Sequence, residues 1–332
     1  MKSPEDLLSK LRQAGRVLIA SHANPDGDAI GSQLGMARLV RRMGKGATVW
    51  CRDPVPAIYR GLPAADRIHV GEEPPRGFPD DYDTLIVLEC PSLDRTGLEA
   101  QLDGMKPLLN IDHHLGNQHY GAVNWVDASA PAVGEMILRL ANDLKIEIDA
   151  DTAACLYLAL VSDTGCFRHS NATPRAFDAA SFLVARGASP ERTTQWLYES
   201  RPAATLKLLG EMLGTLEISS AGRVATALLT PEMYQRSGAT HSDAEGLVDY
   251  PRSIDGVAAV ALLRVLDGNR VKVSLRSRGD GVDVERIARK HGGGGHRAAA
   301  GFEMTGEIAA LRRDVAAELD SELQALQATE TA

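Results

Sequence analysis

Four short segments in the first half of this chain combine acidic residues with histidines, and each follows an apolar run. They hold His22, Asp26 and Asp28 in HANPDGD, Glu89 after TLIVL, Asp112-His113-His114 after PLLNI, and Asp163 in SDTG after a helical run. Carboxylates and imidazoles gathered in a partly buried crevice are costly unless a cation neutralises them. Together the four segments predict a metal site with more than one ion.

The ligand types indicate which metal and which reaction to expect. A set rich in carboxylates, with imidazoles and no thiolates, suits Mn²⁺ or Mg²⁺ better than Zn²⁺. Two such ions ~3.5–4 Å apart can clamp the attacking and leaving oxygens of a displacement at phosphorus. The set therefore favours phosphoester hydrolysis.

Each segment also has a plainer interpretation. Asp28 could cap the following helix, and a lone histidine is more often a polar core residue than a ligand. Glu89 and Asp163 gain weight only from the other segments. The adjacent His113 and His114 should point to opposite sides of a strand, so we expect one to bind metal and the other to face the substrate.

A glycine-rich segment, GGGGHRAAAG, begins at Gly292, more than a hundred residues downstream. Four glycines allow backbone N–H groups to approach an anion closely, and His296 and Arg297 add donors and charge. A flexible turn is the plainer alternative. No GK[ST] follows, so this is not a Walker loop. We expect a loop that binds a phosphate or nucleotide.

Length and composition limit the classes of protein to consider. A chain of 332 residues is longer than one core usually supports, which favours two domains. A net charge of −8 argues against a protein that holds duplex DNA by its phosphates, but not against a small anionic substrate. No apolar stretch approaches the roughly 20 residues of a membrane helix, and no signal peptide is recognisable. A cytoplasmic location is the expectation, with the four scattered cysteines reduced.

Strand-like and helical runs alternate in the first half. The runs at 16–21, 47–50, 84–89 and 107–112 read as strands, and 30–43, 133–144 and 151–161 read as helices. This alternation predicts an N-terminal doubly wound, mainly parallel sheet with helices on both faces, which binds ligands at the carboxyl ends of its strands. Residues 191–216 read as a helical linker broken at Pro202.

After residue 217 the pattern changes to strand-like runs at 223–230, 256–266 and 270–278, followed by helical runs at 282–291 and 306–328. In the run 270–278 the apolar Val271, Val273 and Leu275 alternate with polar residues that include Arg276. This period of two places Arg276 on a polar sheet face. We expect a smaller C-terminal α/β domain with a mixed sheet, and the divisions 1–190, 191–216 and 217–332.

Four motifs, HANPDGDAIGS, NIDHH, SDTGCFRHSNATP and GGGGHRAAAG, stand in this order along the chain. Over nearly its full length the chain resembles the DHH phosphoesterase superfamily with its DHH-associated C-terminal domain. The segments YESRP and LKLLG, and the stretch from SLRSRG to DVERIARKHGGGGH, look most like the bacterial nanoRNases, also known as pAp phosphatases.

The resemblance implies two ions, most simply Mn²⁺ with Mg²⁺ as the alternative. His22, Asp26 and Glu89 would hold one ion, and Asp28, Glu89, His113 and Asp163 would hold the other. Asp112 would orient the histidine ligand, and His114 would stabilise the transition state or the leaving oxygen. The nucleotide would be held by Arg95, Arg276, Gly293, Gly294, Gly295 and His296.

One residue departs from the family pattern. Glu89 stands where the family usually has aspartate, and Asp94, the nearest alternative acid, lies beyond the strand end. The expected reaction is hydrolysis of short single-stranded RNA to mononucleotides, with conversion of pAp to AMP as a second reaction. Neither duplex DNA nor a membrane is an expected partner, and the family often forms homodimers.

Three alternatives remain open. A RecJ-like single-strand exonuclease would be expected to carry a further nucleic-acid-binding domain, which the sequence does not reveal. A soluble cyclic-dinucleotide phosphodiesterase would use the same metal site. A non-catalytic nucleotide sensor is suggested only by the unusual Glu89.

Overall fold

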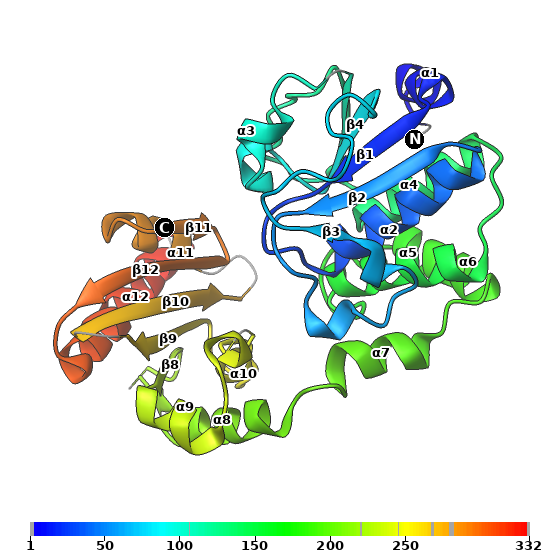
Figure 1. The fold of residues 1–332 in the computed structure, drawn as a ribbon. Coiled ribbons are helices and arrows are strands. Elements are labelled where there is room, and N and C mark those ends of the chain that lie inside the picture. Colours follow the sequence, from blue (N-terminus) through cyan, green and yellow to red (C-terminus); the bar gives the residue numbers. More distant parts are fainter. Residues whose placement is uncertain are drawn as a thin grey trace. The chain divides into compact units, whose positions relative to one another are not determined.

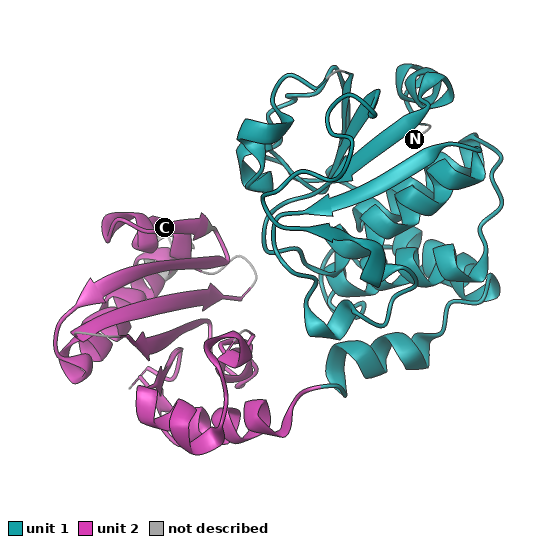
Figure 2. Ribbon diagram, viewed as in Figure 1, with its two compact units in different colours: residues 1–200 teal, residues 201–332 magenta. Residues whose placement is uncertain are grey.

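The computed structural model describes residues 3–105, 107–219, 221–244, 246–266, 269–278 and 282–330, without the side chains of His296 and of residues 327–330. The chain forms two compact units, residues 1–200 and 201–332 (Figure 2). No helix among the described residues is long and apolar enough to cross a membrane. The expected linker contains α7 (Pro190–Tyr198) in the first unit and α8 (Ala203–Leu213) in the second. The three-part division at residues 190 and 216 remains a proposal.

A parallel sheet of six strands forms the centre of the first unit, in the order β3-β2-β1-β4-β5-β6 (Figure 1). Its strands are β1 (Arg16–Ala20), β2 (Gly46–Cys51), β3 (His69–Val70), β4 (Thr84–Leu88), β5 (Leu108–Asp112) and β6 (Val123–Val126). The direction of winding reverses between β1 and β4, and open α/β sheets bind ligands beyond the carboxyl ends of the strands at such a point. The predicted doubly wound parallel sheet is confirmed, and the short strands β3 and β6 are additions to it.

Both faces of this sheet are covered, which explains why its strands read as continuous apolar runs. Val17 and Ile19 of β1 point into one core, and Leu18 and Ala20 point into the other. The larger core lies under helices α2 (Gly27–Arg42), α4 (Val133–Asp143), α5 (Ala150–Asp163) and α6 (Pro174–Ala185), and α1 (Glu5–Gln13) adds three leucines to it. The smaller core lies under α3 (Glu99–Leu102) and nearby loops. Short 3₁₀ helices occur at η1 (Ala57–Tyr59), η2 (Ala65–Arg67) and η3 (Leu93–Thr96).

Helices α2 and α5 pack unusually closely. A Cβ atom on Gly31 of α2 would lie 2.4 Å from the carbonyl oxygen of Cys155 in α5, so only glycine fits there. This close contact brings the first turn of α2 and the last turn of α5 together at the carboxyl edge of the sheet, where both helices carry acidic residues.

The second unit contains a mixed sheet in the order β11-β12-β10-β9-β8-β7. The strands of this sheet are β7 (Glu217–Ile218), β8 (Val224–Leu229), β9 (Ala259–Val265), β10 (Arg270–Ser277), β11 (Gly294–His296) and β12 (Ala299–Thr305). The helices that follow α8 in this unit are α9 (Pro231–Ser237), η4 (His241–Ala244), α10 (Asp249–Arg252), α11 (Val284–Lys290) and α12 (Ile308–Glu330). Only the pair β8–β9 is parallel among these strands. Val271, Val273 and Leu275 are buried as predicted, and Arg276 is partly exposed. The predicted mixed sheet is therefore confirmed.

The glycine-rich segment differs from the expected loop. After a turn at Gly292, the chain enters the edge strand β11, which pairs with β12. A Cβ atom on Gly293 would lie 2.2 Å from the carbonyl oxygen of Gly301, and one on Gly295 would lie 2.5 Å from that of Ala299. At least two of the glycines are therefore required by close packing of the backbone at the sheet edge. The side chain of His296 lies outside the described part of the structure.

Candidate metal centre

The four predicted segments meet at the carboxyl edge of the parallel sheet. His22 follows β1, Glu89 directly follows β4, and His113 and His114 directly follow β5. Asp26 and Asp28 stand at the start of α2, and Asp163 is the last residue of α5. Among the described residues, three groups of side chains have potential ligand atoms within 4.8 Å of one another: His22 with Asp26 and Glu89, Asp28 with His113 and Asp163, and Glu89 with His113 and His114.

The first group is organised around the imidazole of His22. Its Nε2 atom lies 2.7 Å from Oε2 of Glu89 and 3.9 Å from Oδ1 of Asp26. Its Nδ1 atom donates to the carbonyl oxygen of Ala23 at 2.8 Å, which orients the ring so that Nε2 faces the two carboxylates. Asp26 also caps α2 by accepting from the N–H of Ala29 at 2.9 Å. The cap of α2 is thus Asp26 and not Asp28, the residue for which the sequence offers capping as the plainer interpretation.

The second group is organised around His113. Its Nε2 atom lies 4.0 Å from Oδ2 of Asp28 and 3.9 Å from Oδ2 of Asp163. Its Nδ1 atom faces the carbonyl oxygen of Ala130 at 3.1 Å and is therefore the protonated nitrogen. Oδ2 of Asp163 also accepts from the amide of Asn171 at 3.0 Å. The second histidine therefore also turns its Nε2 atom toward two carboxylates.

Asp28 is fully buried and is held by three donors. Its Oδ1 accepts from the hydroxyl of Ser32 at 2.7 Å and from the N–H of Gly134 at 3.0 Å, and its Oδ2 accepts from the N–H of Val133 at 2.7 Å. The last two donors belong to the first turn of α4, whose N-terminal amides have no partner within their own helix. Asp28 thus supplies the cap that α4 lacks at Ala132.

Glu89 joins the two groups. Its Oε2 faces His22, and its Oε1 lies 3.6 Å from Nε2 of His113 and 3.6 Å from Nε2 of His114. The residue is 3% exposed, and Oε2 has no hydrogen bond of acceptable geometry within the described residues. Buried polar atoms are nearly always satisfied, so a carboxylate oxygen without a hydrogen bond beside the imidazole of His22 fits a bound cation. The donor set therefore suits divalent cations, with Glu89 shared between two ligand groups.

The sequence pattern predicts that His113 and His114 point to opposite sides of a strand. In the structure both rings instead turn toward Glu89. Both Nε2 atoms are equally far from Oε1 of Glu89, and the rings stand at 85° to each other. Strand β5 ends at Asp112, so the alternation of side chains no longer applies beyond it. Asp112 accepts from Nδ1 of His114 at 2.8 Å and from Asn117 at 2.6 Å. It thus orients His114, whereas a backbone carbonyl orients His113.

The charges of the centre are unbalanced in the absence of cations. Burial alone lowers the pKa of His22, but the carboxylates of Asp26 and Glu89 outweigh it and raise this pKa to about 11. Burial likewise lowers the pKa of His113, but Glu89 and Asp28 outweigh it and raise this pKa to about 10. Burial and the charge of Glu89 raise the pKa of Asp163 to about 6. The raised pKa values of the two histidines thus reflect the surrounding carboxylates, which would equally favour bound divalent cations.

One supporting segment is absent from the sequence interpretation. Asp127 follows β6 at the same sheet edge and accepts from Arg139 at 2.8 Å, from Arg175 at 3.0 Å and from the hydroxyl of Ser129. These contacts hold the turn that delivers the carbonyl of Ala130 to His113. The position of an acid directly after a strand was the available signal, but β6 is too short to stand out.

The predicted substrate-binding residues belong to both units. Arg95 is exposed in η3, and its carbonyl accepts from the N–H of Ala23 at 2.7 Å, which ties the second predicted segment to the first. Arg276 lies on β10, with its Nε 3.9 Å from a carboxylate oxygen of Asp249. Gly293 precedes β11, and Gly294 and Gly295 lie within it. Their roles stay predictions.

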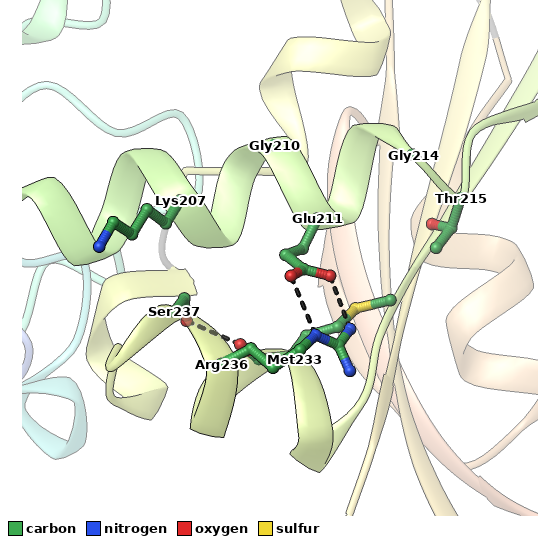
Figure 3. A pocket seen from close by; sticks show the side chains of 8 residues that line it. All are labelled: Lys207, Gly210, Glu211, Gly214, Thr215, Met233, Arg236 and Ser237. Carbon is green, nitrogen blue, oxygen red and sulfur yellow. Dashed lines mark hydrogen bonds and ion pairs between the residues drawn. The ribbon is translucent and has the colours of Figure 1, made fainter.

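A cavity of about 620 Å³ in the second unit contains none of the predicted residues (Figure 3). It lies between α8 and α9, and Glu211 and Arg236 pair with each other across it at 3.0 and 2.6 Å. Because these two charges satisfy each other, the cavity does not compete with the sheet edge as a reactive centre.

Comparison with known proteins places the chain among phosphoesterases. The profile of the DHH family, N-terminal domain, matches residues 16–160, and that of the DHHA1 domain matches residues 222–325. A bifunctional oligoribonuclease and PAP phosphatase NrnA of Thermus thermophilus is 35% identical over 88% of this chain and 85% of its own length. The Bacillus subtilis protein of the same name is 27% identical over 89% of this chain and 91% of its own. An exopolyphosphatase-related protein from Bacteroides fragilis has a similar structure, with a TM-score of 0.88, 26% identity and 97% of each chain covered.

Proposed function

The chain belongs to the DHH family and carries a DHHA1 domain, and from this we propose that it hydrolyses short RNA oligonucleotides to mononucleotides and converts pAp to AMP. The observation that carries this proposal is the buried carboxylate of Glu89. One of its oxygens faces His22 in the first ligand group, and the other faces His113 in the second. The relatives from Thermus and Bacillus, named as oligoribonucleases and PAP phosphatases, support the choice of substrate.

Each residue of the centre has a proposed role. His22, Asp26 and Glu89 would hold one divalent cation, and Asp28, Glu89, His113 and Asp163 would hold a second, with Mn²⁺ preferred. Such ions supply activation of water and neutralisation of the charge that develops on a phosphoryl group. The imidazole of His114, oriented through Nδ1 by Asp112, would donate from Nε2 to the phosphoryl or leaving oxygen.

Recognition of the nucleotide is assigned to the residues around the centre and in the second unit. We propose that Arg95 and Arg276 contact phosphate oxygens, because guanidinium groups match the geometry of phosphate. Gly293, Gly294, Gly295 and His296 would contact the nucleotide through backbone N–H groups and an imidazole. The proposed place of action is the cytoplasm, where the free cysteines of the chain would stay reduced.

The test is a Mn²⁺-dependent assay on a labelled RNA dinucleotide. Wild type is expected to release mononucleotides, and His113→Ala is expected to lose at least about a hundredfold in rate, because one ligand group loses its imidazole. His69→Ala is the matched control, since its ring nitrogen contacts the carbonyl of Glu73 and belongs to none of the three ligand groups. Equal, negligible turnover by wild type and His113→Ala would favour a nucleotide sensor and refute the proposal.

The same assay ranks the substrates. Turnover should be compared on an RNA dinucleotide, an RNA pentamer, pAp and cyclic di-AMP at equal Mn²⁺ concentration. The proposal requires the dinucleotide to exceed cyclic di-AMP in kcat/KM. The reverse order would replace it by a cyclic-dinucleotide phosphodiesterase.

A further inference from the structure

A second concentration of charge lies at the far end of helix α2 from the metal centre. A cavity of about 340 Å³ is lined by Arg38, Arg41, Arg42, Ala64, Arg67 and Asp149. Most of the lining residues are arginines, although the chain as a whole has a net charge of −8. Asp28 and Arg38 are ten residues apart on α2, a separation of roughly 15 Å along the helix axis. The cavity is therefore distinct from the metal centre and lies in the same unit.

Two of the arginines are held in fixed orientations. Arg38 pairs with Asp149 at 3.2 Å and with Asp151 at 2.7 Å, and Arg42 pairs with the same oxygen of Asp149 at 2.8 Å. Asp149 is at the same time the cap of α5, accepting from the N–H of Thr152. Two carboxylates thus pair with two of the four guanidinium groups, which leaves an excess of positive charge around the cavity.

The excess resides on Arg41 and Arg67. Arg41 donates to the carbonyl of Ala47 at 2.8 Å, and within the described part of the chain neither residue has a carboxylate within 4.0 Å. Burial and the positive charges of Arg67 and Arg38 lower the pKa of Arg41, in keeping with the proximity of these guanidinium groups.

The negative end of the α2 dipole accounts for part of this arrangement, since cations are favourable in a last helical turn. It does not account for Arg67, which comes from η2, a separate segment of the chain. Arginines from two segments that converge on one cavity, some of them preorganised by carboxylates, are typical of a site for an anion.

We propose that this cavity is a binding site for a small phosphoryl anion, with Arg41 and Arg67 as its principal donors. Guanidinium groups bind phosphoryl oxygens through paired N–H donors. The volume of the cavity is at the lower end of that of small-molecule sites, which fits inorganic phosphate, pyrophosphate or the phosphate of a mononucleotide. The site does not depend on the proposed hydrolysis.

The test is a calorimetric titration of the full chain, loaded with Mn²⁺, with pyrophosphate, inorganic phosphate and AMP. Because the metal centre can also bind phosphate, wild type should be compared with the double variant R41Q/R67Q, with H113A and with R12Q. R12Q is the matched control, since Arg12 is an exposed arginine of the same unit that pairs with Glu5. A thermal unfolding curve for each variant checks that it is folded.

We expect one class of binding sites with the same Kd in wild type, H113A and R12Q. In R41Q/R67Q the affinity of this class for the anion should be at least about tenfold weaker. The double variant R41K/R67K, which keeps the charge but loses the paired donors, should fall between wild type and R41Q/R67Q. Equal affinity of R41Q/R67Q and wild type would overturn the proposal. Binding of AMP in this class without any binding of phosphate or pyrophosphate would also overturn it, because the base would then be the recognised group.

Discussion

Replacing Glu89 with glutamine or with aspartate separates the charge of this residue from its reach. Glutamine keeps the length of the side chain and removes its charge, so both ligand groups lose the same attraction for a cation. Aspartate keeps the charge, but its carboxylate withdraws by about one C–C bond, roughly 1.5 Å. From the position of Glu89, between His22 and the pair His113 and His114, we expect glutamine to weaken both ions and aspartate to weaken mainly one.

The magnitude follows from the burial and contacts of the carboxylate. Glu89 is 3% exposed, so water cannot replace the lost charge. A buried interaction of a charged group contributes about 1.5–3 kcal/mol, which corresponds to a roughly ten- to hundredfold higher Kd for each ion in the glutamine variant. The aspartate variant should fold without added backbone strain, because the φ of Glu89 is +51° and aspartate tolerates the left-handed region well.

The assay is a titration of metal-free protein with Mn²⁺, with free Mn²⁺ followed by electron paramagnetic resonance. Wild type should bind two equivalents, E89Q should bind both more weakly, and E89D should show two clearly different affinities. His113→Ala serves as a reference that removes a ligand from only one of the two proposed ions. Two wild-type affinities in E89Q would refute the assignment of Glu89 as the shared ligand, and equal weakening in E89D would refute the argument from reach.

Three further predictions test other parts of the structure. First, burial raises the pKa of Asp127, but Ser129 and two arginines outweigh it and hold this pKa well below its usual value. The stabilising contribution of Asp127 is therefore present above about pH 4 and is lost as the pH falls through the folded pKa. D127N should flatten the acid limb of a curve of unfolding free energy against pH, and an unchanged limb would count against this. Second, the pKa values of His22 and His113 are raised to about 11 and 10 in the metal-free protein. Binding of Mn²⁺ at pH 7 should therefore release about two protons, and the affinity for Mn²⁺ should increase with rising pH. Calorimetry in buffers of different ionisation enthalpy measures the number of protons released, and zero release would contradict this prediction. Third, Gly31→Ala places a methyl group 2.4 Å from a backbone oxygen of α5 and should cost about 1–3 kcal/mol of unfolding free energy. Alanine at Gly210 of α8, where nothing lies within 4 Å and φ is not positive, serves as the control and should not destabilise the protein.

The sequence predicts the parallel sheet and the meeting of its four acidic segments because long apolar runs end directly at those segments. β4 and β5 lie within one residue of the predicted runs, and β1 ends one residue early. The sequence does not predict the turn at Asp127, because β6 has only four residues, of which just Trp125 is buried. The alternation expected for His113 and His114 does not hold either, because β5 already ends at Asp112 and a pattern of alternation cannot show where a strand ends. Two of the three donors to Asp28 are backbone N–H groups, which leave no trace in residue types.

The carboxylates of the centre also serve as helix caps, and this determines which variants are informative. Asp26 caps α2, and Asp28 receives the first amides of α4, so replacing either acid removes a cap as well as a proposed ligand. A loss of activity in those variants would therefore combine unfolding with loss of metal. His113 is a sharper probe, because Nδ1 contacts a single carbonyl, that of Ala130, and Nε2 faces only the centre. If His113→Ala keeps the thermal stability of the metal-free protein while losing one Mn²⁺, the imidazole acts as a ligand rather than as part of the core.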